Sequence, residues 1–161
     1  MPRWLVKEEP SHYSFDDLSR DRTTEWSGVH NALALRHLKG MRPDDEVFYY
    51  HSGTERAIVG IARVSGVPRA DPTDERGSWS VTIRAERPLR RPVGLAVVKA
   101  DPSLAGFDLV RIGRLSVMPV SDTQWSRLLS YEAGADPPGQ RKAAARRPRR
   151  RRAASRKRGS T

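Results

Sequence analysis

The sequence of 161 residues contains no cysteine. This absence excludes disulfide bonds, zinc–thiolate centres and a thiol nucleophile from the chemistry of the chain. No apolar run is long enough to cross a membrane, and the residues after Met1 lack the pattern of a secretory signal peptide. We therefore expect a soluble intracellular protein without a membrane partner, cytoplasmic or nucleoid-associated in a bacterium and nuclear in a eukaryote.

Enzyme signatures are also scarce. The sequence has no phosphate-binding glycine loop and no G-x-S-x-G nucleophile motif. Its four histidines lack the i, i+4 and H-x-E spacings of common metal sites; they are His12, His30, His37 and His51. An acid–base pair of Glu9 and His51 can be imagined, but nothing in their spacing requires it. We expect no metal, no cofactor and no catalytic residue.

Acidic residues are absent from the C-terminal segment, residues 137–161, which holds eleven basic residues. Residues 1–136 hold 19 basic and 19 acidic residues, so the whole net charge of +11 belongs to this tail. With no aliphatic residue larger than alanine, the tail cannot bury enough apolar surface to offset its ordering entropy, and we expect it to be disordered. Such a segment binds phosphates by counterion release without reading sequence. The expected backbone-binding residues are Arg141, Lys142, Arg146, Arg147, Arg149, Arg150, Arg151, Arg152, Arg156, Lys157 and Arg158.

Two other interpretations of the tail stay open, a solubilising extension and a targeting signal. In each case the composition changes at the proline-rich segment that starts at Asp136. We therefore divide the chain into a folded domain over residues 1–135 and a disordered Arg-rich tail over residues 136–161. The first part is long enough for one domain with a hydrophobic core.

Hydrophobic patterning predicts an α+β fold. Strands are expected over residues 3–7, 46–51, 57–67, 78–85 and 114–120, the last at a sheet edge because of Pro119. Helices are expected over residues 14–20, 31–40, 95–99 and 121–134, two of them opened by capping boxes at Ser14 and Ser121. Residues 20–25 and 101–108 read as loops. Short strands with short helices between them favour a small mixed β-barrel with helical decoration.

The stretch from Trp26 to Met41 is the best candidate for a binding site. Asn31 is placed to cap the following helix, and Gly40 to end it in a left-handed conformation. Trp26 and Gly28 precede the helix, so an aromatic ring, a permissive backbone and free N–H donors meet at one place. That arrangement suits a planar polar ligand. The alternative is a core tryptophan beside a capped helix.

Polar residues at the ends of two predicted strands strengthen the case for a pocket. Lys7 and Glu8 end the first strand, and His51 and Ser52 end the second. Polar groups at strand and helix ends beside an aromatic residue are typical of an orientation-specific pocket. Each also has a simpler interpretation: Lys7 and Glu8 can be solvated, and His51 can cap a neighbouring carbonyl.

The sequence resembles the EVE domain family of the PUA-like superfamily. The matching segments occur in the family's order and include WLVKEEP and WSGVHN; they are residues 4–10, 13–18, 26–31, 50–52, 58–62 and 113–120. This resemblance implies a PUA-like β-barrel with a pocket suited to a nucleobase. It also implies a reader of modified bases, with 5-methylcytosine and its oxidised forms in DNA the usual proposal.

Carried over by position, the pocket residues implied by the resemblance are Lys7, Glu8, Glu9, Trp26, Gly28, Asn31, His51, Ser52, Arg114 and Ser116. The expected function is a non-catalytic, monomeric module that takes a flipped base against the face of Trp26. The alternatives are an RNA-binding module that recognises a modified RNA base, and an enzyme or small-metabolite binder localised by its tail. The family usually has serine at Glu8 and arginine at His30, so the preferred modification is open.

Overall fold

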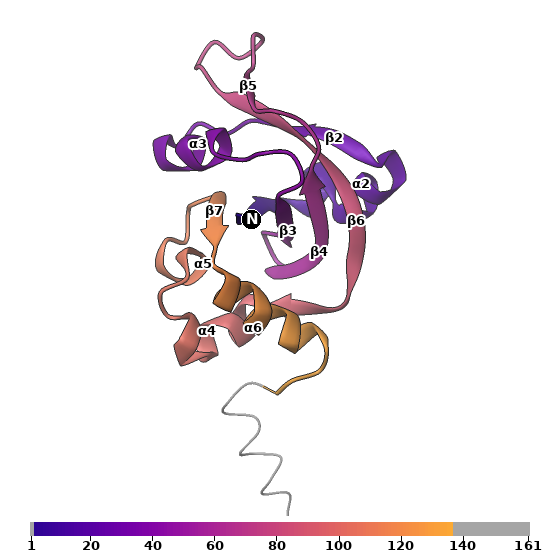
Figure 1. The fold of residues 1–161 in the computed structure, drawn as a ribbon, viewed down its shortest axis with the longest axis vertical. Helices are drawn as coiled ribbons and strands as arrows, with labels where there is room; N and C mark the ends of the chain where they lie inside the picture. The colour runs from indigo at the N-terminus through magenta and orange to yellow at the C-terminus, as the bar shows by residue number, and fades with distance from the viewer. Residues whose placement is uncertain (1, 137–161) are drawn as a thin grey trace, which may run out of the picture.

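The structure, a computed structural model, describes residues 2–136 and is built around one mixed sheet of seven strands (Figure 1). The strands are β1 (Arg3–Glu8), β2 (Thr23–Trp26), β3 (Glu46–His51), β4 (Ala57–Val64), β5 (Arg69–Ala70), β6 (Trp79–Gly94) and β7 (Val117–Val120). The helices are α1 (Pro10–Tyr13), α2 (Phe15–Asp21), α3 (Ala32–Lys39), α4 (Leu95–Ala100), α5 (Asp108–Arg111) and α6 (Asp122–Glu132), with a 3₁₀ helix at Pro102–Leu104. The predicted α+β class and PUA-like mixed sheet are confirmed.

The order of strands is β2-β6-β4-β3-β1-β7, with β5 paired to β6 beside this path. Among the strands of residues 2–136, only β1 and β3 run parallel, and the other pairs are antiparallel. The edge position predicted for the last strand is confirmed, because β7 pairs with β1 alone and carries Pro119. The strands at the two ends of this order are β2 and β7, and the candidate site described below lies between them.

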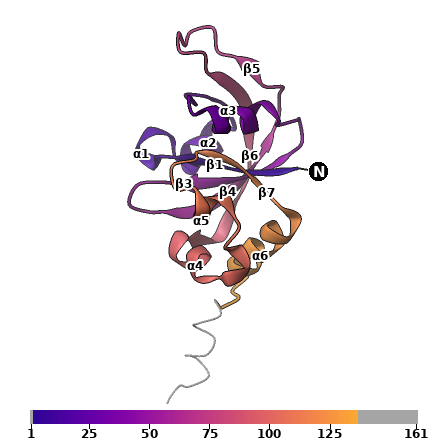
Figure 2. The same cartoon turned by 90° about the vertical axis from the view of Figure 1, so that its left-hand side faces the viewer.

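Helices lie at both ends of the molecule. Figures 1 and 2 show α3 near β5 at one end of the molecule, and α4 and α6 at the other. The central strands are buried over consecutive residues, as expected for a sheet covered on both faces. Phe48 of β3 stacks on Trp125 of α6 with ring centroids 3.8 Å apart, which ties the last helix to the core. Within residues 2–136, the helices are all too short or too polar to cross a membrane.

The helix N-caps predicted from the sequence are confirmed by side-chain hydrogen bonds in the structure. Both capping boxes form, at Ser14 and at Ser121. Asn31 caps α3 by accepting from the N–H groups of Leu33 and Ala34. The left-handed conformation predicted for Gly40 is wrong: its φ is −83°, because its N–H closes the last helical turn onto His37.

Several elements differ from the sequence-based expectation, among them α1 and β5, which the pattern did not predict. Residues 23–25, expected as loop, form β2 together with Trp26 because β6 supplies a pairing edge for them. The predicted strand at 78–85 continues to Gly94 through Pro88 and Pro92, with irregular pairing to β4 that accommodates the bends. The expected loop at 101–108 contains a 3₁₀ helix and leads into α5.

The close backbone approach expected at Gly60 is confirmed. A Cβ added there would lie 2.5 Å from the ring of Phe15, and the pairing of β4 shifts register beside it. Glycine at this position lets α2 lie directly on the sheet. The contact between Phe15 and Gly60 holds the start of α2 against the sheet.

Candidate functional site

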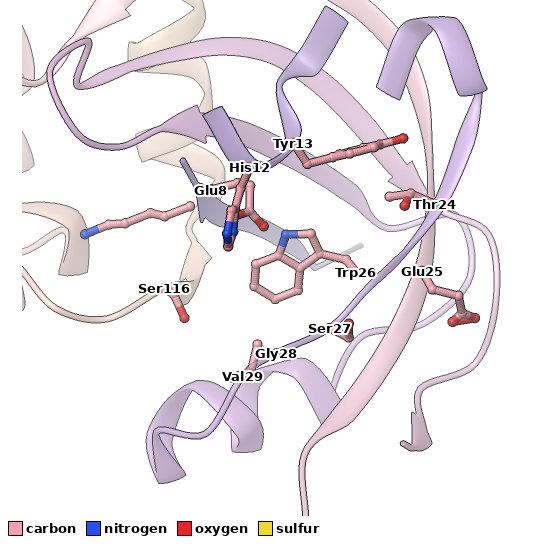
Figure 3. A pocket seen from close by; sticks show the side chains of 11 residues that line it. Glu8, His12, Tyr13, Thr24, Glu25, Trp26, Ser27, Gly28, Val29 and Ser116 are labelled. Atoms are coloured by element: carbon pink, nitrogen blue, oxygen red, sulfur yellow. The ribbon is translucent and has the colours of Figure 1, made fainter. Parts of the chain in front are cut away.

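A cavity of about 460 Å³ lies between the two ends of the sheet path. One wall comes from β1 and α1, a second from β2 and the residues that follow it, and Ser116 closes the third side just before β7 (Figure 3). Its size falls within the range of about 300–1,000 Å³ usual for small-molecule pockets. The lining residues are Lys7, Glu8, His12, Tyr13, Thr24, Glu25, Trp26, Ser27, Gly28, Val29 and Ser116.

Trp26 forms the inner wall of the cavity. It exposes only 4% of its surface, so little of either ring face is open for a base to stack on, contrary to the stacking role expected from the sequence. Its Nε1 is buried and has no hydrogen-bond partner among the described residues. Figure 3 shows this nitrogen on the side of Glu8 and His12. An unsatisfied buried donor costs about 1–3 kcal/mol, so an acceptor on a ligand would recover that cost.

Glu8 supplies a partly dehydrated carboxyl group to the lining of the same cavity. Its side chain is 21% exposed, and its Oε1 accepts from the backbone N–H of Glu9 at 3.2 Å and lies 3.8 Å from Nδ1 of His12. Burial raises the pKa of Glu8 above its ordinary value, against the opposing effect of the Glu9 hydrogen bond. The cavity therefore presents an acceptor that has lost part of its water shell.

Lys7 lines the cavity from β1, on the same wall as Glu8. Its Nζ donates to the carbonyl of Gly113 at 2.7 Å and lies 5.7 Å from the ring centroid of Tyr50. Burial lowers the pKa of Lys7. Its backbone N–H donates to the carbonyl of Ser116 at 2.9 Å, so the strand end and the segment before β7 are joined twice. Lys7 thereby positions Ser116 at the rim.

Half of the ten pocket residues expected from the sequence are brought together in this cavity. They are Lys7, Glu8, Trp26, Gly28 and Ser116. Gly28 has a φ of +82°, which places the chain in the left-handed region where glycine is favoured, so the turn after β2 needs this residue.

The other five expected residues lie outside the lining. The side chain of Asn31 is engaged in capping α3, and Glu9 is the N-cap residue of α1. The backbone N–H of Ser52 donates a hydrogen bond to the carbonyl of Glu8 at 2.9 Å. Arg114 is exposed, two residues before Ser116.

His51 has a defined internal role. Its Nε2 accepts from the backbone N–H of Phe15 at 3.0 Å, and its Nδ1 lies 2.8 Å from the carboxylate of Glu55. These contacts require a proton on Nδ1 and a lone pair on Nε2. His51 therefore pins the start of α2 to the end of β3, and its hydrogen bonds go to Phe15 and Glu55, with none to Glu9.

Sequence analysis missed six lining residues. Ser27 and Val29 belong to the matching WSGVHN segment and could have been read from it. The others come from α1 and β2, two elements that the pattern did not predict; they are His12, Tyr13, Thr24 and Glu25. The polar tail and its eleven basic residues lie outside the described residues. Within residues 2–136, no group of three metal-ligating side chains comes together.

Comparison with known proteins identifies a family and a curated relative that the chain is similar to. The model of the EVE domain family matches residues 2–131. Thymocyte nuclear protein 1 of Rattus norvegicus is 28% identical over 164 residues, which cover 80% of this chain and 73% of the rat protein.

Two solved structures show the same fold. The NMR structure of a protein from Rhodopseudomonas palustris is 40% identical, with a TM-score of 0.78 over 84% of this chain and 96% of that one. The crystal structure of the human THYN1 protein in complex with DNA containing 5-methylcytosine is 25% identical, with a TM-score of 0.76 over 84% of this chain and 100% of that one.

Proposed function

Because the chain belongs to the EVE domain family, we propose that it is a non-catalytic nucleic-acid-binding protein that holds a modified cytosine of the 5-methylcytosine type in the cavity beside Trp26. The observation that carries this proposal is the buried, unpartnered Nε1 of Trp26 in the cavity wall. The human relative bound to DNA with 5-methylcytosine supports the class of ligand.

The base reaches the cavity by leaving its stack in the DNA. Burying a single methyl group contributes only about 0.8 kcal/mol, which is about a fourfold preference. Any stronger selectivity comes from the fit of the whole base to the walls and from the ease of flipping. The polar groups of the lining then fix the orientation of the base, and the basic tail holds the phosphate backbone without reading sequence.

Filling the cavity tests the proposal. Ser116→Phe places a phenyl ring at the rim, where Ser116 is half-buried, while the backbone bond from Lys7 stays available. We expect the wild-type protein to prefer an oligonucleotide with 5-methylcytosine over the unmodified one by at least about fourfold, and the variant to bind both equally. Fluorescence polarisation with matched DNA and RNA strands measures both affinities and identifies the polymer.

Ser126→Phe is the matched control, because Ser126 is exposed on α6, away from the cavity lining. This variant should keep the wild-type preference, and thermal unfolding should confirm that both variants are folded. A wild-type preference that survives unchanged in Ser116→Phe would show that the base is held elsewhere.

A further inference from the structure

Two polar groups that line the cavity, Glu8 from β1 and Trp26 from β2, are incompletely used by the protein itself. Nε1 of Trp26 is a buried donor without a partner. Glu8 makes its contacts to Glu9 and His12 through Oε1, which leaves Oε2 without a hydrogen bond in the described part of the chain. In the view of Figure 3, the edge of the Trp26 ring that carries Nε1 is turned toward Glu8. The cavity therefore offers a ligand one hydrogen-bond acceptor and one donor.

The chemistry of this pair limits what it can bind. A carboxylate repels phosphate and other anions, so the pair does not form a phosphate site. It is satisfied by a neutral group that carries an N–H donor next to an acceptor. The edge of cytosine has this arrangement, with the 4-amino group beside ring N3.

We propose that Glu8 and Trp26 form a reading pair for the amino edge of the bound cytosine: Glu8 accepts from the 4-amino group, and Nε1–H of Trp26 donates to ring N3. This inference rests on the proposed function and adds the groups that select the base. Thymine in the same orientation places a carbonyl oxygen against the carboxylate and is rejected. A partly dehydrated carboxylate makes a stronger hydrogen bond than a neutral acceptor, which increases the discrimination.

Glu8 also makes this chain differ from the family pattern, in which serine is usual at this position. A hydroxyl group can donate or accept and so tolerates either edge, whereas a carboxylate only accepts. The chain should therefore depend on the amino group more strongly than its Glu8→Ser variant does. The dependence of binding on the amino group can therefore be compared between glutamate and serine at position 8.

A double-mutant cycle between protein and base tests the role of Glu8. The probes are matched oligonucleotides with 5-methylcytosine, with 5-methyl-2-pyrimidinone, which lacks only the 4-amino group, and with thymine. In the wild-type protein, removal of the amino group should weaken binding by about tenfold to a hundredfold, the value of a hydrogen bond to a charged group. In Glu8→Ala and Glu8→Ser the loss should shrink to about threefold or less. Ratios within each variant cancel the effect of the lost charge on general affinity.

The indole signal of Trp26 tests the other half of the pair. Of the four tryptophans, Trp4 already donates its Nε1–H to Asp45 at 2.9 Å and serves as an internal control. In ¹H–¹⁵N spectra, addition of the 5-methylcytosine oligonucleotide should move the Trp26 indole proton downfield and leave that of Trp4 in place. An unchanged Trp26 signal at saturation overturns its assignment as a donor.

Different results would contradict the reading pair and the proposed function on which it rests. If 5-methylcytosine is preferred over cytosine but removal of the amino group costs the same in wild type and in Glu8→Ala, the cavity reads the base without Glu8 and the reading pair is wrong. If the wild-type protein shows no preference between cytosine and 5-methylcytosine and Ser116→Phe changes nothing, the proposed function fails, and the reading pair fails with it.

Discussion

Deletion of residues 137–161 is expected to weaken DNA binding by about a hundredfold or more at low salt, while the ratio of affinities for methylated and unmethylated DNA stays unchanged. The reason is the distribution of charge: all eleven excess cations are in this segment, and residues 1–136 are balanced. If the tail neutralises six phosphates, the logarithm of the binding constant should fall with the logarithm of salt concentration with a slope of about −5. The truncated protein should show a much shallower slope.

Fluorescence polarisation at several salt concentrations measures both slopes. The control keeps the length of the tail and replaces its arginines and lysines by glutamine, so that only charge is removed. This variant should behave like the truncated protein. A steep slope that persists after truncation would place the phosphate contacts on the folded domain, and a loss of base preference would show that the tail takes part in reading the base.

The second large effect concerns stability. Asp101→Asn is expected to lower the free energy of unfolding by about 3 kcal/mol, because it breaks a buried charged network. The side chain of Asp101 is 1% exposed and accepts from Ser103, from Nε of Arg127 at 2.6 Å and from the hydroxyl of Tyr131. These contacts tie the segment after α4 to α6. Urea unfolding at pH 7 measures the difference.

Asp16→Asn is the matched control, since Asp16 is exposed on α2 and should change stability by no more than about 0.5 kcal/mol. A similar loss in both variants would contradict the network.

The same aspartate predicts a pH dependence. Burial alone would raise the pKa of Asp101, but hydrogen bonds from Tyr131, Arg127 and Ser103 hold it below its ordinary value. A depressed pKa in the folded state stabilises the protein fully above the unfolded value of about 3.9, and this contribution is lost as the pH falls below it. The stability advantage of the wild type over Asp101→Asn should therefore be constant from pH 7 to about pH 5 and shrink at lower pH.

The sequence predicted those features that depend on neighbouring residues. Capping at Ser14, Asn31 and Ser121 is a contact over two or three residues, so the residue types alone indicate it. The strand over residues 46–51 is likewise indicated by its run of β-branched and aromatic side chains. The resemblance to a family supplied the fold, which no local pattern could specify.

The cavity depended on contacts that the sequence does not show. Residues 23–25 are Thr-Thr-Glu, with no hydrophobic alternation, and they become a strand only because β6 pairs with them. The same tertiary effect builds α1 after Pro10 and brings Tyr13 to the lining. Local pattern also could not distinguish polar groups that line the cavity from those used internally, such as His51, which bonds to Phe15.

An NMR measurement of the 5-methyl group in the complex tests most directly whether the cavity holds the base. The oligonucleotide would carry a ¹³C-labelled methyl group on one 5-methylcytosine, bound to the full-length protein. We expect nuclear Overhauser effects from this methyl group to side-chain protons of Trp26, Val29 or Ser116, which line the cavity, and their absence in Ser116→Phe. A saturated complex in which the methyl group contacts only neighbouring DNA protons would contradict the assignment of this cavity as the base-binding site.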